Sequence, residues 1–401
     1  MNALESTKMF KTLEDELQNI TEYWKNNAVD EQYGGFIGRR DHSNQVIPEA
    51  SKGVILNTRI LWSFSAVGMY KNDSSLRTYA ERSFHYLEKY FRDQAFGGVF
   101  WELGYKGNPF HKRKQVYAQA FTIYGLSRFY LYTGKVEALS WAKELFEMLE
   151  EHAYDSEADG SLEAFAEDWS PIEDMRLSKK DMNSSKTMNT HLHILEAYTE
   201  LSKVWKDPRV LQALRKLIHL FHTKFLNEDN HYELFFDTKW NLQSSTVSFG
   251  HDIEAAWLLV EAAKAINEPA MLRKTSEACV TVAKCFLQKA YIPKKGVLNE
   301  LDRRTGVIDE DRHWWPQAEA MVGLLYAYEI DKDARFENAL KDIWEFILKH
   351  QIDKDNGEWF FRIDKNMNPY KEEDKLGMWK CPYHNSRALI VLLEHYKKQT
   401  E

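Results

Sequence analysis

Apolar residues recur along most of the chain with the spacing of one helix face. In the segment AERSFHYLEKYF, Ala80, Phe84, Leu87 and Phe91 follow one another at intervals of three or four residues. This spacing places their side chains on one side of a helix. The segment WAKELFEMLEE at 141–151 repeats the pattern, whereas alternating runs of Val, Ile and Thr are nearly absent. The sequence therefore predicts an almost entirely helical protein.

A polar turn interrupts the helical segments six times at nearly even spacing. Each copy combines acidic residues or Asn, then a glycine or another residue that tolerates positive φ, and then an aromatic residue or Leu. The copies recur about every 60–70 residues, and a fixed period of this kind indicates a repeat architecture. The fourth copy departs most from the pattern. The copies are centred on Gly35, Gly98, Gly160, His231, Gly296 and Gly357.

Each period has room for two helices and two loops, which indicates six helical hairpins. The long apolar segment 116–134 ends at Gly134, a residue that commonly terminates a helix. An open stack of hairpins would need polar caps at both ends, whereas a closed ring has no ends to cover. We therefore predict an all-α fold, an (α/α)6 barrel. Six inner helices are surrounded by six outer ones, with the glycine turns gathered at one rim.

Composition is consistent with one catalytic domain that spans residues 1–401. The chain is long enough for a large core, and no Pro-, Gly- or Ser-rich linker divides it. The N-terminal segment lacks the apolar stretch of a signal peptide, and no apolar run approaches the length of a membrane span. We expect a monomer that does not bind membranes.

Charge and cysteine content restrict the compartment and the partners. The net charge of −8 argues against a nucleic-acid partner. The three cysteines, Cys279, Cys285 and Cys381, are few and odd in number, which favours a reducing cytoplasm over a disulfide framework. Aromatic residues make up 14% of the chain, including 13 tryptophans. Most of these are expected in helix packing, but some could stack on sugar rings.

Polar residues occupy positions near the start of several barrel helices where apolar residues are expected. In the segment SSKTMNTHLHILEAYTE, Asn189, His193 and Glu196 fall on one helix face. In VSFGHDIEAAWLL, His251 and Glu254 are three residues apart at a helix start. A structural explanation is available for each, because Asn189 could cap its helix and a carboxylate favours a helix N-terminus.

Two further polar groups lie near helix starts in the C-terminal third of the chain. The segment DRHWWPQAEA contains Trp314, Trp315 and Glu319, and GMWKCPYHNSRA contains Trp379 and His384. The latter could be a surface turn with an aromatic plug. Helix starts that are adjacent in a ring converge on one cavity, and ionisable groups that share a cavity are candidates for a functional site.

Several kinds of chemistry use histidines and carboxylates in a pocket. The pairs His193–Glu196 and His251–Glu254 could each supply two metal ligands from one helix face, although no Cys cluster or HExxH motif is present. Each pair could equally be a base with its orienting carboxylate. Glycoside hydrolysis needs two carboxylates that flank the bond, whereas histidine dominates here. Histidine suits proton transfer next to a carbonyl at neutral pH.

The segments SKTMNTHLHILEAYT, SFGHDIEAAWLL, WWPQAEA and WKCPYHNSRA resemble the N-acylglucosamine 2-epimerase superfamily, most closely its cellobiose 2-epimerase branch. GVILNTRILWSFSA at 53–66 and KQVYAQAFTIYGLS at 114–127 are similar to the same branch. The resemblance runs from about residue 30 to about residue 390. It implies an (α/α)6 barrel without metal or cofactor. It also implies epimerisation at C2 of the reducing-end sugar of β-1,4-linked disaccharides, for example cellobiose or lactose.

The resemblance also implies a role for each candidate residue. His251 and His384 would be the two acid/base histidines, and Glu254 would orient or tune His251. Arg59 would stabilise the charge that develops on O1 and O2, and Asp181 would contact outer hydroxyl groups. The remaining residues would position the reacting sugar or stack on sugar rings: Tyr117, Asn189, His193, Trp315 and Trp379.

Three alternatives to this function remain open at the level of sequence. Other members of the superfamily are aldose–ketose isomerases that act on mannose-type monosaccharides, or epimerases that act on N-acylglucosamine. A carbohydrate-binding or regulatory barrel without catalysis is the third. Histidine catalysis implies a bell-shaped pH profile with one limb near neutrality, because the ordinary pKa of histidine is about 6.5.

Overall fold

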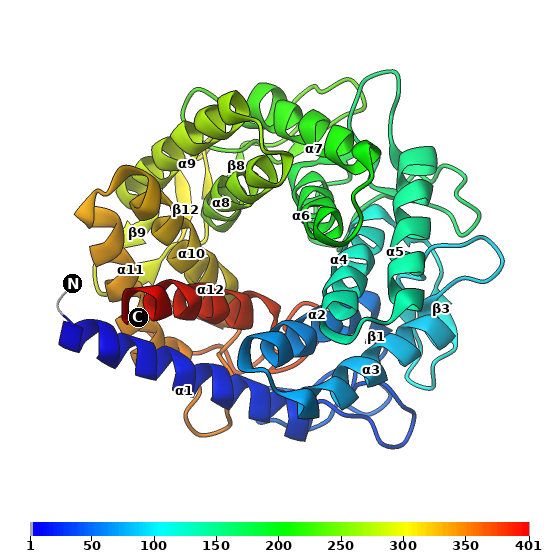
Figure 1. The fold of residues 1–401 in the computed structure, drawn as a ribbon, viewed down its shortest axis with the longest axis horizontal. Helices are drawn as coiled ribbons and strands as arrows, with labels where there is room; N and C mark the ends of the chain where they lie inside the picture. Colours follow the sequence, from blue (N-terminus) through cyan, green and yellow to red (C-terminus); the bar gives the residue numbers. More distant parts are fainter. Residues whose placement is uncertain (1–2, 401) are drawn as a thin grey trace.

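Helices in two concentric rings form the body of the molecule (Figure 1). The computed structural model describes residues 3–400, and within them it contains twelve α-helices. The inner ring consists of α2 (Val54–Lys71), α4 (Val116–Thr133), α6 (Met188–Val204), α8 (Phe249–Ile266), α10 (Trp314–Asp331) and α12 (Tyr383–Thr400). The outer ring consists of α1 (Ala3–Asn27), α3 (Arg77–Tyr86), α5 (Val136–Met148), α7 (Pro208–Leu220), α9 (Pro269–Lys289) and α11 (Ala334–Phe346).

The hydrophobic pattern decides which ring a helix joins. Inner helices are apolar on nearly all sides and touch neighbours on both sides, so α4 is buried without interruption from Val116 to Ser127. Outer helices carry one apolar face, and on α7 the buried positions include Val210, Leu214 and Leu217. The predicted faces of the segments 80–91 and 141–151 are buried, and Gly134 ends α4 in a left-handed conformation with φ of 71°.

Each outer helix leads through one copy of the repeated turn into the next inner helix. Four outer helices end in a single π-helical turn, at Leu87–Phe91, Leu149–Ala153, Phe221–Phe225 and Ile347–Gln351. In the fourth copy Asn230, rather than His231, adopts the left-handed conformation, with φ of 64°. The predicted location of all six turns at one rim is confirmed, since every copy connects an outer to an inner helix.

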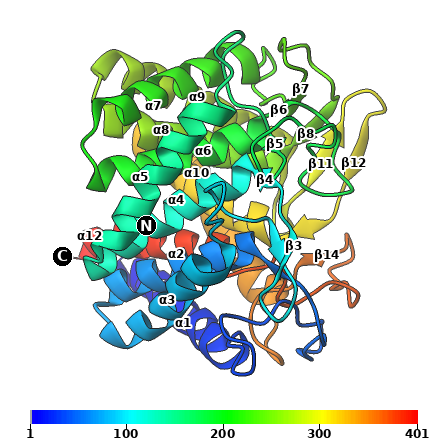
Figure 2. The same ribbon diagram turned by 90° about the vertical axis from the view of Figure 1, so that its right-hand side faces the viewer.

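Short antiparallel strands join neighbouring repeats at this rim (Figure 2). The strand before an inner helix pairs with a strand that follows the next copy of the turn, as in β1–β2, β4–β5 and β6–β7. The strands are β1 (Lys52–Gly53), β2 (Glu102–Leu103), β3 (Pro109–His111), β4 (Lys114–Gln115), β5 (Ala164–Phe165), β6 (Lys186–Thr187), β7 (Phe235–Phe236), β8 (Thr246–Ser248), β9 (Tyr291–Ile292), β10 (Gly296–Val297), β11 (Glu300–Asp302), β12 (Val307–Asp309), β13 (Arg312–His313) and β14 (Arg362–Ile363).

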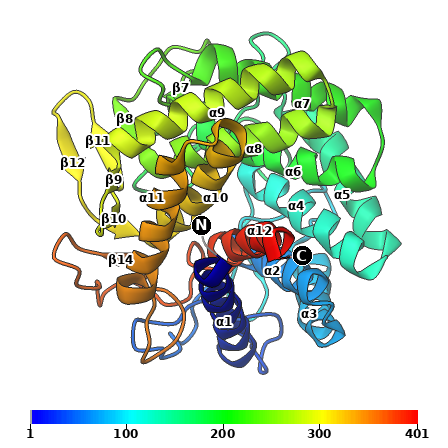
Figure 3. The same cartoon turned by 60° about the vertical axis from the view of Figure 1, so that its left-hand side comes forward.

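The two ends of the chain close the ring. Helix α12 packs between α10 and α2, and α1 packs against its outer side (Figure 3). A β-bridge between Arg40 and Leu376 joins the first repeat to the segment before α12, as the strand pairs do elsewhere. The predicted (α/α)6 barrel is confirmed, with the sixth inner–outer pair built from the first and last helices. None of the helices within residues 3–400 has the length and apolar character needed to cross a bilayer.

Candidate active site

A cavity of about 490 Å³ lies at the strand-covered end of the inner ring. All ten residues singled out from the sequence line it. They are Arg59, Tyr117, Asp181, Asn189, His193, His251, Glu254, Trp315, Trp379 and His384.

The helix register explains why these side chains meet. The inner helices begin at this rim, and five of them direct their sixth residue toward the barrel axis. These sixth residues are Arg59, Phe121, His193, Glu254 and Glu319. Asp181 and Trp379 come instead from the loops before β6 and α12.

His384 and Glu319 form a histidine–carboxylate pair across the ring. The Nδ1 of His384 on α12 lies 2.6 Å from Oε1 of Glu319 on α10. Arg387 Nη2 and Trp257 Nε1 also donate to Glu319, at 2.7 and 3.0 Å. A carboxylate that accepts three hydrogen bonds favours its charged form and holds the proton of His384 on Nδ1. The Nε2 of His384 is then left as a base.

Glu254 differs from the prediction that it orients His251. Its Oε1 accepts a hydrogen bond from Arg387 at 2.8 Å and lies 3.8 Å from Nδ1 of His384. Burial and the nearby charge of Glu319 raise the pKa of Glu254 well above its ordinary value. Burial also raises the pKa of Glu319. Because the two carboxyls share one guanidinium, the titration of each depends on the other.

His251 is held by a hydroxyl group. Its Nδ1 lies 2.8 Å from Oγ of Ser248, the last residue before α8. Burial lowers the pKa of His251 to about 3, so the imidazole is neutral. A serine hydroxyl can accept from or donate to Nδ1, and His251 is therefore compatible with either tautomer. Its ring packs on Trp315, whose indole also contacts His384, with ring centroids 4.8 and 5.7 Å apart.

His193 and Glu196 form the predicted pair on one face of α6. The Nδ1 of His193 lies 2.9 Å from Oε2 of Glu196. Burial alone would raise the pKa of Glu196, but Arg387 and His193 hold it down at about 2. Glu196 also accepts hydrogen bonds from Tyr383 and Arg387. Arg387 thus links the carboxylate partners of His193 and His384.

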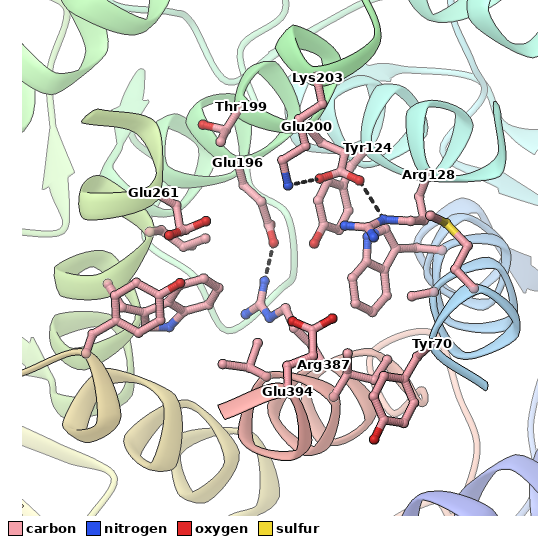
Figure 4. Close-up of a pocket in the computed structure, with 18 residues that line it drawn as sticks. Tyr70, Tyr124, Arg128, Glu196, Thr199, Glu200, Lys203, Glu261, Arg387 and Glu394 are labelled. Carbon is pink, nitrogen blue, oxygen red and sulfur yellow. Dashed lines mark hydrogen bonds and ion pairs between the residues drawn. The ribbon is translucent and has the colours of Figure 1, made fainter. Parts of the chain in front are cut away.

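The opposite side of this network faces a second cavity (Figure 4). That cavity, of about 350 Å³, is lined by Glu196 and Arg387 together with residues from later turns of the inner helices. The Arg387–Glu196 ion pair therefore forms a floor between the catalytic pocket and the far end of the barrel.

Arg59 supplies a cation without a carboxylate partner. Within residues 3–400 no carboxylate oxygen lies within 4.0 Å of its guanidinium, and the side chain is buried. Its Nη2 donates to the hydroxyl of Tyr117 at 2.8 Å, and the guanidinium packs over Phe121 and Tyr383. Burial raises the pKa of Tyr117, so the hydroxyl keeps its proton. This arrangement is suited to binding an oxygen atom that carries negative charge.

Asn189 does not cap α6, because the side chain of Thr187 accepts the cap hydrogen bond from Thr190. The Oδ1 of Asn189 is buried and has no hydrogen-bond partner within the described part of the chain. Together with Asp181 and His251, it also lines an adjoining cavity of about 570 Å³. Most of the residues that line this cavity are polar, among them Asn299 and Glu300.

A cluster of possible metal ligands lies in this site. The ligand atoms of Glu254, Glu319 and His384 lie within 4.8 Å of one another. The guanidinium of Arg387, however, donates to the same two oxygens, Oε1 of Glu254 and Oε1 of Glu319. A bound cation would have to displace Arg387 and would be repelled by it. The residues therefore do not fit a metal ion here.

Activity is expected to survive treatment with a chelator. Arg387 already supplies the positive charge between the two carboxylates, so removal of divalent ions should leave kcat unchanged. The measurement is kcat after dialysis against EDTA, together with metal analysis of the protein. A loss of activity that Mn²⁺ or Zn²⁺ restores would contradict this expectation.

Two residues of this network were assigned no role from the sequence, although Glu319 was named among the polar groups near helix starts. Glu319 and Arg387 stand in the motifs WWPQAEA and HNSRA, but no local pattern showed that they meet. The register of Glu319 was available as a signal, since it is the sixth residue of α10 as Glu254 is of α8. No comparable signal in the sequence pointed to Arg387, whose guanidinium contacts carboxyl groups on three other helices.

Comparison with known proteins agrees with this geometry. A model of the N-acylglucosamine 2-epimerase family matches residues 35–388. The chain belongs to this family.

Individual relatives and a solved structure show a more specific similarity than the family model does. The chain is 43% identical to the cellobiose 2-epimerase of Bacteroides fragilis, over 96% of this chain and 100% of that one. The solved structure of the cellobiose 2-epimerase of Bacillus thermoamylovorans superposes with a TM-score of 0.92, at 34% identity, covering 97% of this chain and all of that one. The D-mannose isomerase of Marinomonas mediterranea is 23% identical, over 95% of this chain and 96% of that one.

Proposed function

We propose that the protein is a cellobiose 2-epimerase-like enzyme that inverts C2 of the reducing-end sugar of β-1,4-linked disaccharides. The observation that carries the proposal is the combination of groups in one cavity. Two neutral histidines on different helices, His251 and His384, share it with the uncompensated cation Arg59. The relative that is 43% identical is named cellobiose 2-epimerase.

The first chemical step is opening of the sugar ring. A pyranose has no acidic proton at C2, so the ring must first become an open-chain aldehyde. This requires an acid that protonates the ring oxygen and a base that removes the proton from O1. His384, whose Nδ1 is held by Glu319, suits the base. The imidazolium of His384 formed in this way then gives the same proton to the ring oxygen, while His251, hydrogen-bonded to Ser248, stays neutral.

The second step removes the proton from C2. The electron pair moves into a C1–C2 double bond, and negative charge collects on O1. The guanidinium of Arg59 and the hydroxyl of Tyr117 then stabilise this enediolate, and one such contact typically contributes about 10²–10³ in rate. The Nε2 of His193 faces the same cavity and can accept a hydrogen bond from a hydroxyl of the open chain.

Epimerisation is complete when the proton returns to the other face of C2. The two histidines stand on α8 and α12, with Trp315 of α10 in contact with both rings. A planar enediol between them would expose one face to each histidine. The histidine that removes the C2 proton becomes an imidazolium, the other takes up a proton from solvent and delivers it to the opposite face, and the roles exchange in the reverse reaction.

The adjoining cavity supports a disaccharide as the substrate. It shares Asp181, Asn189 and His251 with the catalytic pocket, has a volume of about 570 Å³ and is lined mostly by polar residues. The second sugar ring would lie there, and its contacts would help to hold the first ring. Trp379 would stack on the reacting ring at the entrance.

Proton NMR of cellobiose with the enzyme in D2O tests the proposal. We expect loss of the C2 proton signal and appearance of glucosyl-mannose. Mannose and glucose are the matched controls, and kcat/KM for them is expected to be lower than for cellobiose. Fructose or a ketose disaccharide as the main product would assign the protein to aldose–ketose isomerisation instead.

The pH dependence of kcat/KM should differ from that of ordinary histidines. Burial lowers the pKa of His251 to about 3 and, with the charges of Arg59 and Arg387, lowers that of His384. Both bases thus stay neutral through pH 6.5, and kcat/KM should remain constant between about pH 6 and pH 8. An acid limb with its midpoint near pH 6.5 would contradict this prediction.

Loss of folding stability at low pH limits the range over which kcat/KM can be measured. The unfolded chain binds a proton at His251 near pH 6.5, whereas the folded one does so only near pH 3. Each pH unit below 6.5 therefore costs up to about 1.4 kcal/mol of folding free energy per such histidine. Circular dichroism at each pH separates this unfolding from loss of a catalytic base.

We further propose that the enzyme acts as a cytoplasmic monomer. All ten candidate residues come from one chain, so the cavity is complete without a partner. The three cysteines are free thiols, which favours a reducing compartment. Light scattering of the purified protein measures its mass and would reveal a dimer.

A further inference from the structure

The fourth copy of the repeated turn departs from the others in two places that touch each other. In three other copies a glycine stands where His231 stands, and the fourth residue of the next inner helix fills the space beside it. A Cβ on these glycines would lie 2.9 Å from Gln119, 2.8 Å from His191 and 2.6 Å from Gln317. In the fourth copy that helix residue is the shorter Asp252, and the imidazole of His231 occupies the remaining space.

Asp252 keeps the structural role of its counterparts. Its Oδ1 accepts a hydrogen bond from the backbone N–H of Tyr232 at 2.8 Å, as Gln119 accepts from Val99 and Gln317 from Val297. Its other oxygen, Oδ2, is therefore free for a second partner. That partner is Nδ1 of His231, at 2.6 Å.

The other ring nitrogen of His231 faces a cysteine. Its Nε2 lies 3.7 Å from Sγ of Cys285, which stands on the outer helix α9 and is half-buried. His231 and Asp252 are buried, and none of the three residues lines the sugar cavity. Nucleophile, base and orienting carboxylate thus follow one another in hydrogen-bond order, as nucleophilic catalysis requires.

We propose that Cys285 is a nucleophilic thiolate, formed by proton transfer to His231, and that it is a site of modification by small electrophiles such as hydrogen peroxide. Geometry alone carries the assignment, because the sulfur is the only partner of His231 Nε2 among the contacts of the described residues. The charge of Asp252 favours the imidazolium, and the hydrogen bond to Asp252 raises the pKa of His231 to about 10 against the cost of burial.

The surrounding charges are consistent with this pair. Glu233 lies near Asp252, but its carboxylate is neutralised by both Nη atoms of Arg303. The Cys285 thiol donates to the backbone carbonyl of Asp229, at 3.5 Å, and proton transfer to His231 breaks this contact. Asp252 therefore remains the acidic group in direct contact with the imidazole.

Cys285, His231 and hydrogen peroxide together supply the atoms, electrons and proton that the oxidation needs. The thiolate sulfur attacks one oxygen of hydrogen peroxide, an S–O bond forms and the O–O bond breaks. The leaving hydroxide takes the proton from His231 and becomes water. Cys285 is oxidised to the sulfenic acid, the peroxide is reduced, and His231 returns to the neutral state.

Alkylation with iodoacetamide, followed by mass spectrometry of each cysteine peptide, tests the proposal. We expect Cys285 to be labelled at pH 7 faster than a model thiol, and His231→Gln to slow this labelling at least about ten-fold. Peroxide followed by a sulfenic-acid trap should modify Cys285 in the native protein and not in His231→Gln.

Two buried thiols provide the control for folding. Cys279 and Cys381 are fully buried and should stay unlabelled in every folded variant. Their labelling would show that His231→Gln has unfolded, in which case Asp252→Asn, which removes the orienting charge, serves as the test variant. The proposal is overturned if Cys285 reacts no faster than a model thiol at pH 7, or if neither folded variant changes its rate.

Discussion

Replacing His384 with asparagine is expected to lower kcat for cellobiose by about 10²–10⁴-fold, the usual contribution of a general acid or base. The amide cannot take up a proton, while its size keeps the contact with Glu319. The same loss is expected for His251→Asn. Steady-state kinetics with circular dichroism of each variant measures the effect.

A histidine outside the cavity supplies the matched control. His191 is buried on α6, two residues from His193, but its Nε2 accepts the backbone N–H of Ser161. His191→Asn should lower stability and leave kcat of the folded protein within a few-fold of the wild type. Retention of more than about a tenth of kcat by His384→Asn would remove His384 from the acid/base role.

The same two variants distinguish between one base and two. If each histidine serves one face of C2, each variant should retain slow exchange of the C2 proton with D2O for one epimer only. Cellobiose and glucosyl-mannose are the two substrates to compare by NMR. Exchange from both epimers in one variant would mean that the remaining histidine reaches both faces.

Arg387→Met is expected to destabilise the protein by about 3–5 kcal/mol, because it removes one partner from a buried ion pair. The side chain of Arg387 is 4% exposed and contacts the carboxyl groups of Glu196, Glu254 and Glu319. Without it, three buried carboxyl groups remain without a counter-ion. Either some of them become protonated, or the protein unfolds. Urea denaturation at pH 7 measures the change in free energy of unfolding.

Arg39→Met is the matched control on the surface. Arg39 pairs with Asp374 at 2.6 Å, a short contact, but its side chain is 50% exposed. Water and salt screen such a pair, so the loss should be about 0–1 kcal/mol. Equal losses for the two variants would contradict the view that Arg387 is an essential counter-ion. The difference in stability between Arg387→Met and the wild type should also become smaller as the pH is lowered toward the pKa of the uncompensated carboxyls, whereas that for Arg39→Met should not.

Local sequence patterns were sufficient to predict the barrel. Helix periodicity and the six turns depend on interactions between residues close in the chain, so they are visible without the fold. The turns were correctly placed at one rim. The even spacing of the copies also implied that polar residues near helix starts would meet, and Asn189, His193, His251, Glu254 and His384 do line one cavity. Arg59, Tyr117 and Asp181, which only the family resemblance indicated, line it too.

The partners of the charged groups required the tertiary structure. The spacing of His193 and Glu196 correctly predicted a pair within one helix, but the same spacing in His251 and Glu254 did not. Glu254 instead turns toward Arg387, which stands 133 residues away in the chain. Helix periodicity fixes the direction of a side chain, whereas the curvature of the ring decides which neighbouring helix it meets.

The protonation states were also decided by the fold. The sequence suggested histidines with ordinary pKa values, yet closure of the ring buries His251 and lowers its pKa to about 3. Closure itself depends on α1 and α12, the two most distant helices of the chain. The sequence by itself thus determined the helices, their faces and which polar helix starts would share a cavity. The tertiary structure decided their pairing and charge, because these depend on desolvation and on contacts between distant segments.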